Sequence, residues 1–215
     1  MTPGQAFFVT GTDTDIGKTM ISAILTIGLN ATYWKPIQSG SIPYTDTNWI
    51  KTVSGLPDDH FLKESYRLTE PLSPHQAAEI DQVTIDKASI RLPATVNHLP
   101  LILEGAGGLM VPLNNKHFMI DLIEDLKLPV LLVARSALGT INHTTLSIHA
   151  LRQRGIPILG VVLNGTRNRG NCQAIERFGR VEVIAEVEPL KVVDRATLLE
   201  TYNQKFGHFA KEFLG

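Results

Sequence analysis

The sequence predicts an α/β fold in which a mostly parallel β-sheet carries helices on both faces. Short runs rich in Val, Ile and Leu alternate with segments of helical length, which is typical of βα units that build a buried parallel sheet. A loop that contains glycine and lysine joins the first apolar run to the first helical segment. The 215 residues, 43% of them hydrophobic, are enough for one domain, residues 1–215, with a substantial core.

Six strands are expected, because six apolar runs have strand length and most of them are rich in Val, Ile and Leu. They lie at residues 6–10, 32–35, 99–103, 130–134, 158–164 and 182–187. Five helices are expected between them, where apolar residues recur at helical spacing. These lie at residues 17–29, 119–125, 141–154, 173–178 and 195–213.

The segment 41–98 interrupts this alternation. It carries prolines among polar turns instead of one long crossover helix, at Pro43, Pro57, Pro71, Pro74 and Pro93. Its aromatic residues favour partial packing over disorder, and they are Tyr44, Trp49, Phe61 and Tyr66. Because loops of this length in compact domains are usually functional, we expect an irregular insertion or lid beside a site.

Charge and cysteine content exclude several classes of partner. Twenty Lys and Arg against 21 Asp and Glu give a net charge of −1, so neither nucleic acid nor an anionic membrane is expected as a partner. Apolar runs such as 130–134 are far shorter than the about 20 residues that span a bilayer, and no secretory signal is expected. The single cysteine, Cys172, cannot form an internal disulfide, which favours a reducing, cytoplasmic location.

The loop after the first strand reads Gly11-Thr-Asp-Thr-Asp-Ile-Gly-Lys-Thr19 and opens a helix. Backbone N–H groups and the positive end of the helix dipole would converge there on a polyphosphate. We expect Lys18 to reach the β and γ phosphates, and the Thr19 hydroxyl to bind Mg²⁺. The usual spacing has four residues between the glycines and this loop has five, so Thr12 stands where the first glycine is usual. A turn that binds nothing is the alternative, and Gly-Lys-Thr at this junction favours a P-loop NTPase-like fold.

Two further strands bring charged side chains to the same edge of the sheet. Glu104 ends the third strand, where a second magnesium ligand is expected. Lys35 ends the second strand, and we expect it to neutralise charge during phosphoryl transfer. A solvated glutamate and a surface lysine are the alternatives. Asp46 lies in a Thr-rich turn, where aspartate is commonly a turn residue or a cap, so the residues alone leave its role open.

Five blocks of the sequence occur in a distinctive order: residues 9–19, 35–40, 70–75, 104–108 and 138–143. In this order they resemble the dethiobiotin synthetase family, ATP-dependent enzymes of biotin biosynthesis, and the resemblance extends over nearly the whole chain. The family's phosphate loop contains the same additional residue. The resemblance implies an ATP- and Mg²⁺-dependent carboxylation and ring closure of 7,8-diaminopelargonic acid with CO₂, giving dethiobiotin, ADP and phosphate.

The resemblance also implies roles for individual residues. It assigns catalysis to Lys35 and Lys18 and the metal to Thr19, Asp46 and Glu104. The residues that it places at the nucleotide phosphates are Asp15, Ile16, Gly17, Lys18, Thr19 and Met20, with the segment Glu104, Gly105, Ala106 and Gly107 close by. The residues that it places at the diamine substrate are Thr14, Ser39, Gly139, Thr140, Ile141 and Asn142, the last four across the interface of a homodimer.

The nucleotide base is assigned by the resemblance to Asn164, Glu188, Pro189 and Leu190. Asparagine can both donate to and accept from adenine. Residues 185–190 depart from the family pattern, because Pro189 is shifted by one position. His75 and His143 also lie in family blocks, and we expect them to be structural or substrate-orienting and to carry no catalytic step.

Two other classes share parts of this pattern. Nucleotide-switch ATPases of the chromosome-partitioning or membrane-positioning type carry an additional lysine near the start of the loop, where this chain has Thr12 and Asp13. No basic amphipathic tail for membrane or DNA is seen either. Amidotransferase-type ligases need a glutaminase domain with its own cysteine, for which 215 residues leave no room.

Overall fold

A computed structural model describes residues 6–93 and 99–214. The main sheet has seven strands in the order β4-β2-β6-β1-β7-β8-β9, and every pairing in it is parallel. Its strands are β1 (Ala6–Gly11), β2 (Thr32–Trp34), β4 (Phe61–Leu62), β6 (Leu101–Gly108), β7 (Val130–Arg135), β8 (Ile158–Asn164) and β9 (Val183–Val187). A second parallel pair is formed by β3 (Ile37–Gln38) and β5 (Tyr66–Arg67). The predicted α/β fold with a parallel sheet is confirmed.

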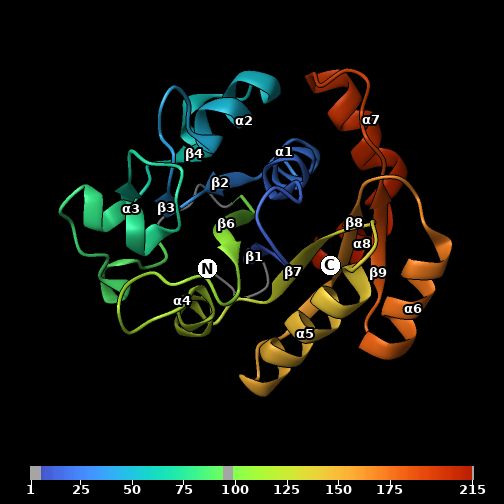
Figure 1. The fold of residues 1–215 in the computed structure, drawn as a ribbon. Helices are drawn as coiled ribbons and strands as arrows, with labels where there is room; N and C mark the ends of the chain where they lie inside the picture. Colours follow the sequence, from blue (N-terminus) through green and yellow to red (C-terminus); the bar gives the residue numbers. More distant parts are fainter. Residues whose placement is uncertain (1–5, 94–98, 215) are drawn as a thin grey trace.

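Two hydrophobic cores lie on opposite faces of this sheet. Figure 1 shows the helices that cover the two faces. Alternate residues of β1 point to opposite faces, so Phe7 and Val9 belong to one core and Phe8 to the other. One face is covered by α1 (Lys18–Gly28), α7 (Arg195–Lys205) and α8 (Gly207–Leu214), with α2 (Asp46–Ser54) at its side. The other face is covered by α4 (Met119–Leu126), α5 (Thr140–Gln153), α6 (Arg169–Gly179) and α3 (Pro74–Ile80). The helices predicted on both faces are therefore present.

The C-terminal segment differs from the prediction of a single helix over 195–213. It forms α7 and α8, because the backbone leaves helical geometry at Phe206 (φ −116°), directly before Gly207. This break lets Phe206 and Phe209 both pack into the core, where the ring of Phe209 lies edge to face with that of Phe7. The helix predicted at 173–178 begins earlier, at Arg169, because the Asn168 side chain caps it and accepts a hydrogen bond from the backbone N–H of Asn171 at 3.0 Å.

The strand predictions need three corrections in the main sheet, and the second sheet of β3 and β5 was not predicted. Lys35 follows β2 instead of ending it, and the residue next along, Pro36, has no N–H to continue the ladder. β6 begins at Leu101, after Pro100, and continues past Glu104 to Gly108. A seventh strand of the main sheet, β4, comes from the insertion. The other predicted strands and helices agree with the structure to within about one residue at each end.

The insertion 41–98 is more regular than predicted over its described part, residues 41–93. It contains α2, β4, β5 and α3 as well as two short 3-10 turns. Local signals start and end α2: the Thr45 hydroxyl accepts a hydrogen bond from the N–H of Asn48 at 3.0 Å, and Gly55 takes the left-handed conformation (φ 59°) after its last residue. Residues 94–98 of the predicted insertion lie outside the described residues.

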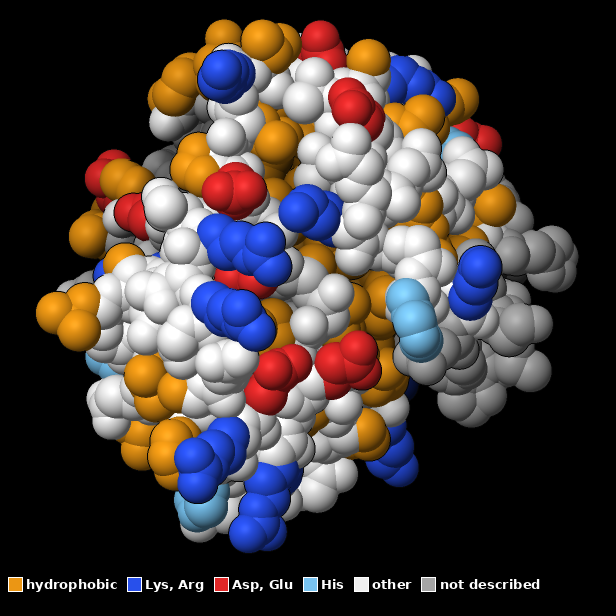
Figure 2. Space-filling model, turned by 90° about the vertical axis from the view of Figure 1, so that its right-hand side faces the viewer, with side chains coloured by type: hydrophobic (Ala, Val, Ile, Leu, Met, Phe, Trp, Pro, Cys, Tyr) orange, Lys and Arg blue, Asp and Glu red, His pale blue; other side chains and the backbone are white. Residues whose placement is uncertain are grey.

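In the described part of the chain, no helix combines the length and the apolar character that a membrane span requires. On the face that carries α6 and α7, side chains of both signs of charge are interspersed and no single-sign patch dominates (Figure 2).

Candidate functional site

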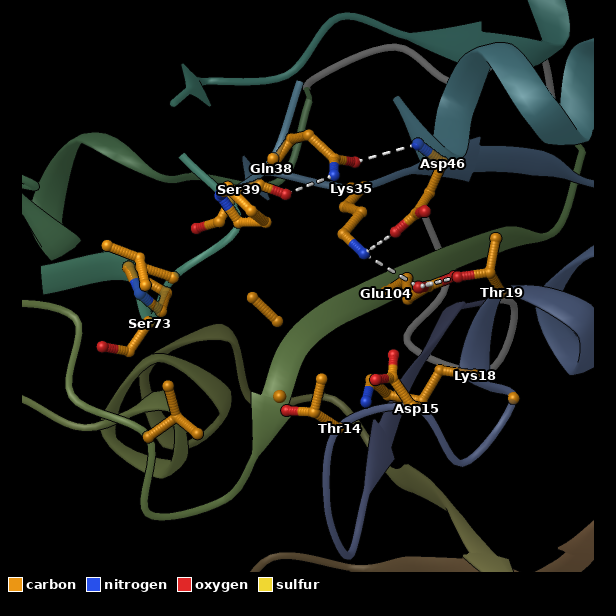
Figure 3. Close-up of a pocket in the computed structure, with 18 residues that line it drawn as sticks. Thr14, Asp15, Lys18, Thr19, Lys35, Gln38, Ser39, Asp46, Ser73 and Glu104 are labelled. Carbon is orange, nitrogen blue, oxygen red and sulfur yellow. Dashed lines mark hydrogen bonds and ion pairs between the residues drawn. The ribbon is translucent and has the colours of Figure 1, made fainter. Parts of the chain in front are cut away.

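A cavity of about 800 Å³ opens at the carboxyl edge of the main sheet. Ligands of parallel α/β sheets commonly bind at this edge. Figure 3 shows the side chains that line it: Lys35, Asp46, Glu104 and Thr19 point toward one another on one side, and Ser73 lies opposite. The lining residues come from four segments: the phosphate loop (Thr14, Asp15, Gly17, Lys18, Thr19), the chain after β2 (Lys35, Gln38, Ser39, Gly40, Asp46), residues 71–74, and β6 with its following turn (Glu104, Ala106, Gly107, Val111).

The phosphate loop has the geometry that the sequence predicts. Asp15 (φ 55°) and Gly17 (φ 91°) adopt left-handed conformations, which turn the chain sharply before α1 begins at Lys18. A Cβ at position 17 would lie 2.0 Å from Nδ2 of Asn164, so only glycine fits there. No side chain caps the start of α1. Its first N–H groups are therefore available to an anion, as at other helix N-termini that bind phosphate.

Lys18 lies at this helix start and is largely buried. Its Nζ donates to the backbone carbonyl oxygen of Asp13 at 2.8 Å, so the ammonium is held over the loop. Burial lowers the pKa of Lys18 to about 8, although the nearby carboxylate of Glu104 opposes that shift. The negative charge of a bound polyphosphate would favour the protonated, positively charged form of Lys18.

Lys35 bridges the two predicted metal-binding carboxylates. Its Nζ donates to Oε1 of Glu104 at 3.0 Å and is ion-paired with Asp46. Lys35 and Glu104 are both buried, with 6% and 0% exposure. Burial alone would lower the pKa of Lys35, but the carboxylates of Glu104 and Asp46 outweigh it and raise that pKa. The ammonium therefore stays charged at the edge of the cavity.

The predicted magnesium ligands are brought together. The Thr19 hydroxyl donates to Oε1 of Glu104 at 2.9 Å, and Lys35 connects that carboxylate to Asp46. One hydroxyl and two carboxylates are the hard oxygen donors that Mg²⁺ takes together with phosphate oxygens and water. Within residues 6–93 and 99–214 no group of three or more His, Cys, Asp or Glu could hold a metal by itself. The donor set thus fits a magnesium ion shared with a phosphate ligand.

Gln38 is a site residue that sequence reasoning missed. Its Oε1 accepts a hydrogen bond from the backbone N–H of Asp46 at 3.0 Å, and its Nε2 donates to the carbonyl oxygen of Ser39 at 2.8 Å. This buried amide therefore ties the chain after β2 to the start of α2. The hydroxyl of Ser39 is buried without a hydrogen-bond partner and lines the cavity.

The wall opposite the charged cluster was also missed. It consists of Pro71, Leu72, Ser73, Pro74 and, from the turn after β6, Val111. Four of these residues belong to block 70–75, one of the five blocks that resemble the family, so this resemblance could have pointed to them. Nothing in the sequence distinguishes Val111. A mainly apolar wall facing a charged cluster suits a ligand that carries both a polar end and an aliphatic chain.

Asn164 lines a second cavity of about 280 Å³ on the other side of the phosphate loop, and its Nδ2 donates to the carbonyl oxygen of Ile16 at 2.9 Å. Arg135 lines this cavity as well and is ion-paired with Asp13 of the loop. The second cavity therefore adjoins the phosphate loop, at the end of β8.

Several predicted site residues line neither cavity. Ile16 is buried in the core, and Met20 packs partly against it. Gly105 is buried beside Phe8. The other residues outside both cavities are Glu188, Pro189 and Leu190 beyond β9, Gly139, Thr140, Ile141 and Asn142 at the start of α5, and the histidines His75 and His143.

The start of α5 presents apolar side chains to the surface. Leu138 is 99% exposed, and Ile141 and Leu146 are exposed as well. Gly139 is the N-cap (φ 92°), and no side chain caps the helix there. Within one chain, this helix start is separate from the large cavity.

Comparisons with known proteins agree on family and fold. Residues 5–197 match a family model described as an AAA domain. The chain is 51% identical to the ATP-dependent dethiobiotin synthetase BioD of Paramagnetospirillum magneticum over 90% of this chain and 93% of that protein. It is 47% identical to the protein of the same name from Rhodopseudomonas palustris strain TIE-1 over 96% of both chains.

The septum site-determining protein MinD of Pyrococcus horikoshii, complexed with Mg-ADP, has a similar structure. It aligns with a TM-score of 0.54 at 14% identity, over 96% of this chain and 95% of that one. At this level of identity the likeness shows the fold alone, and it confirms the predicted P-loop NTPase-like fold.

Proposed function

The chain belongs to the ATP-dependent dethiobiotin synthetase family, and on this premise we propose that it carboxylates and closes the ring of 7,8-diaminopelargonic acid. The products are dethiobiotin, ADP and phosphate. One observation supports this most: Lys18, Lys35 and Glu104, from three separate segments, converge on a single cavity at the sheet edge. Phosphoryl transfer needs positioned positive charge of this kind around the transferred group.

The phosphate loop would hold the ATP phosphates. The N–H groups at the start of α1 and the ammonium of Lys18 would contact the β and γ phosphates. Thr19, Asp46 and Glu104 would hold the magnesium ion, which neutralises charge on the phosphates when bound. Asn164, beside the second cavity, would contact the adenine. The assignment of Glu188, Pro189 and Leu190 to the base remains a prediction from the resemblance.

The reaction would proceed in two stages in the large cavity. A carbamate forms from CO₂ and one amine of the substrate, and its oxygen attacks the γ phosphorus of ATP, so that ADP leaves. The second amine then attacks the carbonyl carbon of the resulting mixed anhydride, forming the second C–N bond of the cyclic urea and expelling phosphate. Lys18 and Lys35 would stabilise the charge on the transferred phosphoryl group from two sides.

The rest of the chemistry is a matter of orientation, because an amine and an anhydride react readily once they are held together. Such preorganisation supplies about 7 to 11 kcal/mol in favourable cases. Thr14 and the unpartnered hydroxyl of Ser39 would orient the diamine end of the substrate. The wall at residues 71–74 would cover its aliphatic chain.

The substrate's carboxylate would be bound by a second copy of the chain. We propose a cytoplasmic homodimer in which the partner subunit's Gly139, Thr140, Ile141 and Asn142 present an uncapped helix start to it. The exposed Leu138, Ile141 and Leu146 around this helix start support an interface there. A helix N-terminus with free N–H groups suits a carboxylate.

A nucleotide switch of the partitioning or positioning type is the competing function, because it shares the fold. The two functions differ in what ATP hydrolysis depends on. For the enzyme, we expect phosphate release to need diaminopelargonic acid, bicarbonate and ATP together, with one phosphate per dethiobiotin. Phosphate release that is indifferent to the diamine would contradict the enzyme and favour the switch.

A further inference from the structure

The two carboxylate oxygens of Glu104 have different partners. Oε1 accepts from the Thr19 hydroxyl at 2.9 Å and from Nζ of Lys35 at 3.0 Å, on the side of the cavity. Oε2 accepts from the phenolic hydroxyl of Tyr33 at 3.0 Å. Glu104 lines the cavity, whereas Tyr33 is fully buried and does not. Tyr33 therefore holds the carboxylate from behind.

Strand register places the two side chains on the same face of the sheet. Tyr33 of β2 lies opposite Ile102 of β6, and Glu104 is two residues further along that strand. Both point to the face covered by α1, which also carries Thr19. A phenol keeps its proton at neutral pH, so the Tyr33 hydroxyl is the donor of this hydrogen bond and Oε2 of Glu104 is the acceptor.

We infer that Tyr33 is a positioning residue for the metal ligand Glu104. Its hydroxyl fixes the plane of the carboxylate, so that Oε1 faces Thr19 and Lys35 at the cavity. Without that hydroxyl, Oε2 would be a buried carboxylate oxygen with no donor, and the carboxylate would turn toward other donors. The inference rests on the proposed magnesium site, and concerns how this chain orders one of its ligands.

The test is Tyr33→Phe, which removes the hydroxyl and keeps the ring that packs in the core. Binding of Mn²⁺, as a probe for Mg²⁺, is titrated by electron paramagnetic resonance with a non-hydrolysable ATP analogue present, so no turnover is needed. We expect the dissociation constant for Mn²⁺ to rise about ten-fold or more, the range seen when a partner of a metal ligand is lost. Binding of the analogue in the presence of EDTA should not change.

Tyr202→Phe is the matched control. Tyr202 is also buried in the core on the α1 side, on α7, and it stacks on Phe206 away from Glu104. Removing the hydroxyl of Tyr202 should leave the dissociation constant for Mn²⁺ unchanged. Thermal unfolding checks that both variants are folded. In a Glu104→Gln background, Tyr33→Phe should cause no further loss of Mn²⁺ binding, because its effect passes through the carboxylate.

Three results would overturn the inference: unchanged Mn²⁺ affinity in Tyr33→Phe, an equal loss in Tyr202→Phe, or no saturable Mn²⁺ binding by the unsubstituted chain. Failure of the proposed function looks different. In that case the unsubstituted chain would bind Mn²⁺ and the analogue but form no dethiobiotin.

Discussion

Replacing Lys35 should affect the rate of the reaction much more than the binding of the nucleotide. Its ammonium is buried between Glu104 and Asp46 and stays charged, yet it belongs to a different segment from the phosphate loop. Lys35→Ala should lower kcat by about 10²- to 10³-fold, as for loss of one preorganised electrostatic contact, and change ATP-analogue affinity only a few-fold. Steady-state kinetics and an analogue titration measure the two effects. Normal turnover would remove Lys35 from the mechanism.

We expect Lys18 to serve both nucleotide binding and phosphoryl transfer. Its Nζ lies over the loop at the start of α1, where the terminal phosphates of ATP are expected. Lys18→Ala should abolish ATP-dependent dethiobiotin formation within the detection limit of a product assay. Lys51→Ala is a suitable control, because Lys51 is a partly exposed lysine of α2 that is paired with Asp58 and lines neither cavity. Full activity of the Lys18 variant would refute the role of the loop.

The sequence predicts a site residue when that residue belongs to a local motif, and it does not when the residue acts through a contact made only in the folded chain. Lys18, Thr19, Lys35 and Glu104 follow directly from strand ends and the loop, and they all line one cavity. Tyr33 could not be predicted, because a tyrosine in an apolar strand is normal core packing. Its contact with Glu104 exists only once β2 and β6 are placed in register.

The negative charge of Asp121 stabilises the start of helix α4. The Asp121 carboxylate accepts a hydrogen bond from the N–H of Phe118 at 2.7 Å and another from the Arg154 guanidinium at 2.9 Å. Partial burial would raise the pKa of Asp121, but these two donors outweigh it and hold that pKa below its usual value. The carboxylate therefore stabilises the fold above its unfolded-state pKa, and this contribution is lost as the pH falls through the lower folded-state pKa.

Asp121→Ala should lower the free energy of unfolding at pH 7 by about 1 kcal/mol, because a helix-start hydrogen bond is lost. The difference in the free energy of unfolding between this variant and the unsubstituted chain should become smaller as the pH falls below about 4, the ordinary pKa range of aspartate. Urea unfolding between pH 7 and pH 3 measures it. A difference that stays constant over this range would show that the charge of Asp121 does not stabilise the start of α4.

Regular periodicity predicted most elements, and local exceptions account for the misses. Where the apolar spacing runs over the full length of a strand or helix, the observed bounds lie within about one residue of the predicted ones. The split at Phe206 was missed because apolar residues keep helical spacing across it. β4 was missed because it has two residues, and only its place beside β2 makes it a strand.

The exposed apolar side chains around Leu138 predict that two copies of the chain associate through this surface. Leu138→Asp should convert a dimer to a monomer and weaken diamine binding, while ATP-analogue binding is retained, because this residue is fully exposed and its side chain lines neither cavity. Sedimentation velocity and substrate titration measure both effects. Phe178→Asp, at an exposed apolar residue of α6, is the control. An unchanged mass and diamine affinity for Leu138→Asp would contradict the proposed interface.

Strand ends distant in sequence form one cavity, and we propose that phosphoryl transfer and ring closure both take place in it. A crystal structure with diaminopelargonic acid, Mg²⁺ and a non-hydrolysable ATP analogue is the decisive experiment. We predict the γ phosphate between Lys18 and Lys35, the metal on Thr19, Asp46 and Glu104, and the diamine beside Ser39 in the same cavity. A nucleotide bound with its phosphates away from these residues, or a diamine bound in a separate cavity, would show that the two reactions do not share this site.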